Sequence, residues 1–156
     1  MTAPAADARV ASIDEVLAFM GLIWAIDHQM ERVSKRMETA IGLTIPQRLS
    51  LLLIGRRPGI LASELATVLH LHRGTMSGIV GRLEDAGLVT RVVEPGDGRR
   101  IGLSLTPAGR RVNARRAGTF EAAVRGVLAA SAPADLAATA SVLARLSTEL
   151  QAVADS

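Results

Sequence analysis

The sequence of 156 residues contains no cysteine, and its only aromatic side chains are Phe19, Trp24 and Phe120. Without cysteine, thiol catalysis, thiol redox sensing, disulfides and cysteine-ligated zinc are excluded. With so few aromatics the core must be aliphatic, and a base-stacking platform for single-stranded nucleic acid is excluded. The sequence also has no apolar run of about 18 residues, and its N-terminus has no basic region followed by an apolar stretch. It therefore predicts neither a membrane span nor a signal peptide, but a cytoplasmic protein.

Lysine is scarce as well, because Lys35 is the only lysine among the 18 basic residues. The basic residues concentrate in the middle of the chain, where residues 44–116 hold twelve arginines and five acidic residues. Such a segment favours a polyanionic partner, nucleic acid first, although a solvated basic surface has the same composition. The length and the 49% of hydrophobic residues suit one globular domain, with or without a helical appendage.

The N-terminal part predicts one long helix that follows a disordered tail over residues 1–11. Ser12 and Glu15 form a capping box, and apolar residues then recur at helical spacing as far as Gly42. At 1.5 Å per residue, such a helix is about 40 Å long. A small module cannot bury it alone, so the sequence predicts that this helix packs on a partner.

The rest of the chain predicts a mainly α fold with a small β-hairpin. A second capping box begins at Thr44, short helices follow on either side of a turn, and the period then changes to that of strands. The predicted helices run from 44 to a stop at 56–59, over 63–69, over 73–86, over 107–130 and from 133 onward, and the predicted strands cover 88–93 and 101–105. A turn-rich, basic loop at 94–100 joins the two strands.

This order of elements is that of a winged helix-turn-helix module. In such a module the second helix of the pair enters the DNA major groove, and a hairpin directly after it forms a wing. The order therefore predicts a recognition helix over residues 73–86 and a wing tip over residues 94–100.

Several short motifs lie on these elements, and the Asp-x-Arg-Arg pattern followed by Leu-Thr-x-x-Gly is the most specific. The motifs are Leu43-Thr44, Gln47, Leu52, Glu64-Leu65-Ala66, Thr75-Met76-Ser77, Arg82-Leu83-Glu84-Asp85-Ala86-Gly87-Leu88-Val89, Asp97-Gly98-Arg99-Arg100 and Leu105-Thr106-Pro107-Ala108-Gly109. Together they resemble the MarR-type transcriptional regulators, over roughly residues 12–153. The resemblance implies a homodimer on a pseudo-palindromic operator. It implies a DNA-binding module over 43–106 and interlocking dimerisation helices over 12–42 and 107–156.

The predicted recognition helix presents a polar face to DNA. The residues with inward spacing are Met76, Ile79, Val80 and Leu83, and those expected to contact base edges or phosphates are Arg73, Thr75, Ser77 and Arg82. His72 occupies the N-cap position and is expected to donate to a phosphate. Glycine weakens a helix by about 1 kcal/mol relative to alanine. The three glycines of this helix suggest close approach of its backbone to DNA, with more of the recognition left to operator shape.

The wing residues take their expected roles from the family resemblance. Arg99 is expected to enter the minor groove, where narrow A·T tracts concentrate negative potential. Asp97 would orient Arg99 through a salt bridge, and Arg100 would hold a phosphate or brace the wing. The alternative is a flexible, solvated loop.

A candidate effector site involves Met20, Trp24, His28 and Arg48, since the family commonly binds small anionic or aromatic ligands beside the dimer helices. A Met and Trp lining with a nearby Arg suits such a ligand. Residues at this spacing are more often plain dimer core. His28 and Glu31 have a spacing that suits a metal, but few other ligands are at hand, so no metal and no cofactor is predicted.

The sequence therefore predicts a homodimeric DNA-binding regulator, a repressor that a small effector releases. The alternatives are a constitutive DNA binder or activator without an effector, and a winged-helix module that binds protein. The sequence has no paired carboxylate set, nucleophile elbow, phosphate-binding glycine loop or metal motif, so an enzyme is not expected.

Overall fold

The computed structural model describes residues 9–94 and 97–156, without the side chains of Glu94 and residues 97–100. The chain forms two compact units, Met1–Ala114 and Arg115–Ser156. The first unit contains five helices and a β-hairpin among its described residues, and the second contains two helices. Each unit is described by itself below.

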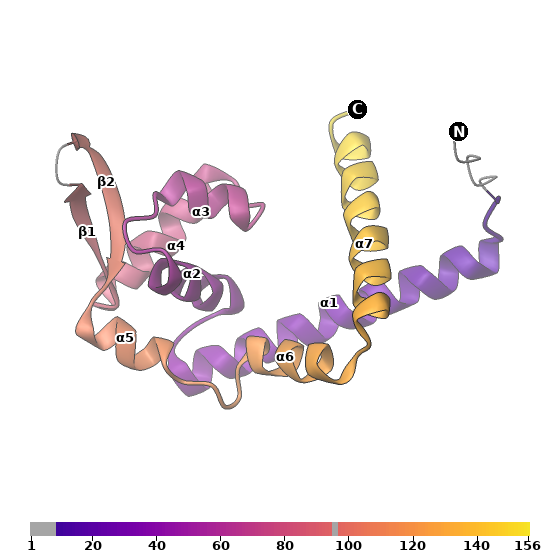
Figure 1. Cartoon of the computed structure of the whole chain (residues 1–156), viewed down its shortest axis with the longest axis horizontal. Coiled ribbons are helices and arrows are strands. Elements are labelled where there is room, and N and C mark those ends of the chain that lie inside the picture. The colour runs from indigo at the N-terminus through magenta and orange to yellow at the C-terminus, as the bar shows by residue number, and fades with distance from the viewer. Residues whose placement is uncertain (1–8, 95–96) are drawn as a thin grey trace. The chain divides into compact units, whose positions relative to one another are not determined.

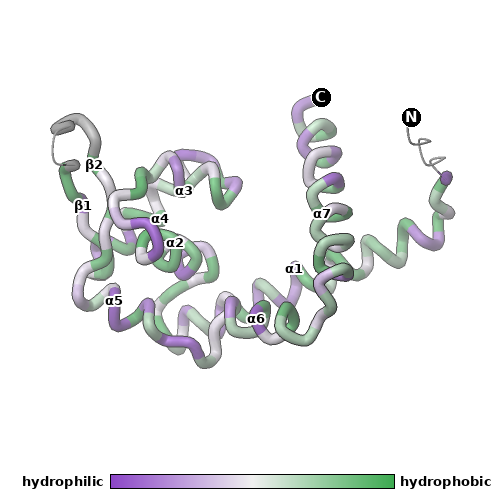
Figure 2. Tube along the Cα trace, in the orientation of Figure 1, coloured by the Kyte–Doolittle hydropathy of each residue, from purple (hydrophilic) through white to green (hydrophobic). Residues whose placement is uncertain are grey.

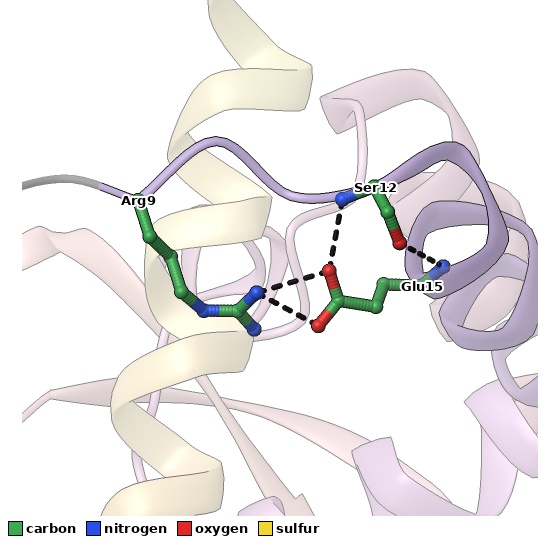
Figure 3. Close-up of polar contacts among 3 residues, drawn as sticks. All are labelled: Arg9, Ser12 and Glu15. Carbon is green, nitrogen blue, oxygen red and sulfur yellow. Dashed lines mark hydrogen bonds and ion pairs between the residues drawn. The ribbon is translucent and has the colours of Figure 1, made fainter.

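Helix α1, Ile13–Ile41, begins and ends at the residues that the sequence predicts. The Ser12 side chain accepts from the Glu15 backbone N–H, and the Glu15 carboxylate accepts from the Ser12 N–H at 2.8 Å and pairs with Arg9 (Figure 3). The Ser12 backbone hydrogen bond, with help from Arg9, lowers the pKa of Glu15. The helix ends at Gly42, whose φ of 72° is left-handed, a conformation that glycine adopts without strain.

The winged-helix elements follow α1 in the first unit. Their bounds are α2 Ile45–Arg56, α3 Ala62–Val68, α4 Arg73–Asp85, β1 Val89–Glu94, β2 Asp97–Leu105 and α5 Pro107–Asn113. In Figure 1 the hairpin lies to one side of α2, α3 and α4, and α5 continues from the end of β2. Three helices and a hairpin in this order confirm the predicted fold class.

An aliphatic core holds these elements together, as the lack of aromatics requires. The core side chains are Leu43, Leu51, Ile54, Ile60, Leu65, Ala66, Met76, Ile79, Val80, Leu83, Leu88, Val89 and Leu103. Burial of one such side chain contributes about 1.5–3 kcal/mol. Because every element from α2 to β2 supplies at least one of them, the core fixes α4 against its neighbours.

The hairpin is antiparallel and is extended by a short third segment. Val89 pairs with Leu105 at its base, and Glu94 pairs with Asp97 near its tip. Beside β2, the Gly59 N–H donates to the Leu103 carbonyl at 2.8 Å, and the Leu103 N–H donates to the Ile60 carbonyl at 2.9 Å. The wing is therefore tied to the chain segment that connects α2 to α3.

Two sequence predictions about these elements are wrong. The loop predicted over 94–100 is mostly strand, because the ladder continues to Glu94 in β1 and resumes at Asp97 in β2. The helix predicted over 107–130 is two helices, α5 and α6, the latter Phe120–Ala130. Gly118 takes a left-handed φ of 71° just before the Thr119 N-cap of α6, and this conformation interrupts the helical path.

The second unit contains α6 and α7, Pro133–Ala154, and neither helix has a buried residue. Apolar side chains that stay exposed on the two helices include Val124, Val127, Leu128, Val142, Leu143, Leu150 and Val153. On α1 the same holds for Ile13, Val16, Leu17, Phe19, Met20, Leu22, Ile23, Trp24 and Ile26. Figure 2 shows hydrophobic segments along all three helices. Met37, near the C-terminal end of α1, is the one buried residue of that helix.

The junction between the wing and α5 explains the Leu-Thr-x-x-Gly motif. Thr106 donates from its hydroxyl to the Gly87 carbonyl at 2.6 Å and accepts at that hydroxyl from the Gly109 N–H at 3.0 Å. The Thr106 N–H also donates to the Leu88 carbonyl. Gly109 is buried, and a Cβ there would overlap the Leu88 carbonyl oxygen. Only glycine lets α5 approach the end of the α4 turn this closely. We name the contacts of Thr106 and Gly109 with Gly87 and Leu88 the wing-base junction.

Substitution of Gly109 by alanine is expected to destabilise the protein by roughly 2–3 kcal/mol, because the added methyl group meets backbone that cannot rotate away. Urea unfolding followed by circular dichroism measures the loss. Gly126→Ala is the matched control, since open space surrounds Gly126 in α6. Alanine at position 126 should raise the free energy of unfolding by about 0.5–1 kcal/mol. Equal changes in the free energy of unfolding of the two variants would contradict the close packing of Gly109 against the Leu88 carbonyl.

Candidate nucleic-acid interface

The turn between α3 and α4 is a hydrogen-bonded helix end with an unusual residue in it. The Leu71 N–H donates to the Ala66 carbonyl at 2.9 Å, and the His70 N–H donates to the Thr67 carbonyl at 3.2 Å. This pair of bonds is the Schellman motif, in which the residue after the C-cap is left-handed and is usually glycine. Here that residue is His70, with a φ of 51°. The end of α4 uses the same motif with Gly87, whose φ is 66°.

Helix α4 has the two faces that the sequence predicts. Its buried residues are Met76, Ile79, Val80 and Leu83. Its exposed residues include Arg73, Thr75, Ser77 and Arg82, which are the candidates for contact with DNA. The inward spacing at three and four residues is therefore confirmed, and the polar side chains are free to meet a ligand.

His72 is the N-cap residue of α4, as predicted from its position. Its backbone is extended, with φ −63° and ψ 146°, and its side chain makes no capping hydrogen bond. The imidazole is exposed. The backbone N–H groups in the first turn of α4 therefore lack a side-chain acceptor from His72, and the side chain remains available to an acceptor outside the chain.

An ion pair joins α4 to the wing. Arg91 of β1 meets Glu84 of α4 through two contacts, Nε to Oε1 at 2.9 Å and Nη2 to Oε2 at 3.0 Å. Two parallel contacts of this kind fix orientation as well as distance. The sequence pattern did not indicate this pair, because seven residues and a change of element separate its members. It neutralises the acidic group closest in sequence to Arg82.

The three wing candidates, Asp97, Arg99 and Arg100, have side chains outside the described residues. Their backbone belongs to β2, which begins at Asp97. Their roles in the minor groove stay predictions.

The four candidate ligand residues differ in exposure. Met20, Trp24 and His28 are exposed on α1, whereas Arg48 of α2 is fully buried. The Arg48 guanidinium donates from Nη1 to the Val112 carbonyl at 2.9 Å and from Nη2 to the Asn113 carbonyl at 3.3 Å. Both carbonyls lie in the last turn of α5, where the helix has no N–H four residues further on to bond them. Arg48 therefore caps α5, a role that the sequence did not indicate.

The described part of the chain has neither a metal-binding cluster nor a helix suited to a membrane. Within residues 9–94 and 97–156, no three His, Cys, Asp or Glu side chains gather as a metal site would require. None of the helices in the same ranges combines the length and the apolar character needed to cross a membrane.

The helix pair α3–α4, the hairpin beside it and the exposed polar face of α4 define a winged helix-turn-helix protein. A family model described as MarR family matches residues 41–100. Over these residues the chain is similar to the MarR family.

A curated relative and two solved structures illustrate the similarity. The HTH-type transcriptional repressor Rv2887 of Mycobacterium tuberculosis is 36% identical over 89 residues, which are 57% of this chain and 64% of the repressor. The match thus spans less than two thirds of that relative. Rv2887 solved in complex with salicylic acid has a TM-score of 0.54 at 28% identity and covers 89% of this chain and 98% of its own. The S. aureus MepR–DNA complex has a TM-score of 0.69 at 19% identity, with coverages of 85% and 97%. The relatives are named as transcriptional regulators, which agrees with the prediction that the chain is not an enzyme.

The left-handed His70 provides a test of the turn. Histidine pays a steric cost in this conformation that glycine avoids, about 1–2 kcal/mol. We therefore expect His70→Gly to raise the free energy of unfolding by about 1 kcal/mol. Gly87→Ala is the mirror control, because its φ is equally left-handed and a Cβ there meets no atom within 4 Å. It should lower stability by a similar amount. Urea unfolding of both variants measures the effects, and a loss in His70→Gly would refute the assignment.

Proposed function

We propose that the protein is a homodimeric, sequence-specific DNA-binding transcriptional regulator, a repressor that a small molecule releases. The observation that carries the proposal is the exposed polar face of α4, the recognition helix. In the described part of the chain, the side chains of Arg73 and Arg82 make no ion pair or hydrogen bond, so both cations are available to DNA. The wing stands beside this face and would enter the minor groove.

Two relatives support the DNA-binding part of the proposal. MepR of S. aureus and FabT of Streptococcus pneumoniae were both solved with DNA, and both share this fold. The name of Rv2887 supports repression in particular. The basic residues in the middle of the chain add attraction for phosphates, which salt weakens.

Dimerisation follows from the apolar side chains that α1, α6 and α7 leave exposed. Exposed apolar surface on each of these helices marks an interface with another molecule. A second copy of the chain has the same surface, so the pair can close around a two-fold axis. Two recognition helices about 34 Å apart then meet successive major grooves, which explains a pseudo-palindromic operator.

Effector binding is supported by the salicylic acid complex of Rv2887. Of the four candidate residues here, the exposed Met20, Trp24 and His28 are open to a ligand. Arg48 reaches a ligand only if it gives up its bonds to the end of α5. A ligand that binds better to the conformation with wrongly spaced recognition helices would weaken DNA binding by that difference in affinity.

DNA binding is tested by fluorescence anisotropy with the upstream intergenic DNA and a scrambled duplex of equal length. We expect preference for the native duplex and an affinity that falls as salt rises. Arg73→Ala and Arg99→Ala should each weaken binding about tenfold, since a good arginine contact contributes about 1–3 kcal/mol. Arg145→Ala, which removes the same charge from exposed α7, is the matched control. Salicylate titrated into the complex tests release.

The DNA proposal fails if neither duplex binds at low salt, and pull-down of protein partners would then follow. The wing assignment fails if Arg99→Ala binds as tightly as the unchanged protein. Equal losses in Arg145→Ala and Arg73→Ala would mean that net charge alone, not the face of α4, determines affinity.

The dimer is tested by placing a charge on α7. Leu150→Glu puts a carboxylate on exposed apolar surface, and we expect it to shift the protein from dimer to monomer in sedimentation velocity, because an unpaired buried charge is costly. Thr148→Glu adds the same charge to an exposed polar position of that helix and should leave the dimer intact. A monomeric unchanged protein would overturn the proposal.

A further inference from the structure

Helix α4 carries three glycines, Gly74, Gly78 and Gly81, on a helix that meets DNA under the proposed function. Glycine is the poorest helix former after proline, so each needs a reason. Tight packing inside the chain is not that reason. A Cβ added at Gly74 or Gly81 would have no atom within 4 Å, and a Cβ at Gly78 would meet only Arg82.

The neighbour of Gly78 is the end of the Arg82 side chain. The Arg82 Nη2 atom lies 3.9 Å from the position that a Cβ of Gly78 would take. Residues four apart lie one above the other on a helix, and helical side chains lean toward the N-terminus. The Arg82 side chain therefore lies back along α4 and carries its guanidinium across Gly78. A side chain longer than alanine at position 78 would need the same space.

This placement moves the charge toward the end of α4 that contacts bases. The guanidinium lies beside position 78, which is about one helical turn, or about 5.4 Å, closer to the N-terminus than position 82. Thr75, Gly78 and Arg82 fall on one stripe at spacings of three and four. The cation thus lies along the same stripe as Thr75, a candidate for base contact.

The Arg82 guanidinium also has no competing partner in the described residues. The nearby acid Glu84 is held by Arg91 through two contacts. Within the ranges that the structure describes, the Arg82 side chain makes no ion pair and no hydrogen bond. A free, exposed guanidinium held along a recognition helix is suited to the acceptors of DNA, whether a guanine edge or a phosphate.

We propose that Gly78 is a positioning residue for DNA recognition: it keeps open the space in which the Arg82 guanidinium lies, and so sets where that cation meets DNA. The inference rests on the proposed DNA-binding function. According to this inference, residue 78 affects the affinity for DNA through Arg82, and not through direct contact between position 78 and DNA.

A double-mutant cycle tests this dependence. The proteins are the unchanged chain, Gly78→Leu, Arg82→Ala and the double variant, each titrated against the native duplex by anisotropy. We expect Arg82→Ala to weaken binding about tenfold, and Gly78→Leu to weaken it by a similar factor because leucine displaces the guanidinium. The double variant should bind no more weakly than Arg82→Ala alone, since the two substitutions remove one contact.

Gly78→Ala is the matched control. Its methyl group would meet Arg82 Nη2 at 3.9 Å, an ordinary contact distance, so the guanidinium stays in place and the affinity should be retained. Gly78→Ala and Gly78→Leu should both have a melting temperature at or above that of the unchanged protein, because each replaces a helical glycine. If Gly78→Leu fails to fold, Gly78→Gln fills the same space and replaces it in the cycle.

Three results overturn the inference. Losses that multiply in the double variant would mean that position 78 acts on DNA independently of Arg82. A loss in Gly78→Ala equal to that in Gly78→Leu would mean that the backbone itself must approach DNA. Full affinity for DNA in Gly78→Leu would mean that DNA binding does not need the open space beside position 78. Each differs from failure of the proposed function, in which the unchanged protein does not distinguish the native from the scrambled duplex.

Discussion

The close approach of α5 to the backbone after α4 is the constraint on which the rest of the winged-helix module depends. At the wing-base junction, Thr106 and Gly109 contact the chain where α4 ends and β1 is about to begin. The Thr106 hydroxyl donates one hydrogen bond and accepts another at this junction. Helix α4, the wing and α5 are therefore attached to each other at one point, in addition to the shared aliphatic core.

The polar contacts around this junction give each neighbouring element a defined position. The Glu84–Arg91 pair fixes the first wing strand against α4, and the Arg48 guanidinium fixes the far end of α5 against α2. A fully buried arginine is expensive to desolvate and is strongly destabilising to disrupt. These contacts resist independent movement of the wing and α4, which suits the simultaneous contact with two grooves of DNA that we propose.

The sequence predicted the elements whose signals are local and missed those that depend on distant partners. The capping box at Ser12 and the glycine at position 42 gave both ends of α1, and the spacing of Met76 to Leu83 gave the buried face of α4. The break before α6 was missed because residues 114–119 include good helix formers. His70 was missed as a left-handed residue because its type does not require that conformation. Burial of Arg48 depends on carbonyls more than sixty positions away, which no periodicity reports.

The position of Trp24 has a practical consequence in spectroscopy. It is the only tryptophan in a chain without tyrosine, so ultraviolet emission comes almost entirely from one place. That place is the exposed N-terminal part of α1, about 15 Å along the helix from Ser34, where α2 is attached through the Ile45 N–H. The indole is 65% exposed in the single chain. Its emission wavelength therefore reports whether this part of α1 is covered, without any label and without interference from the winged-helix module.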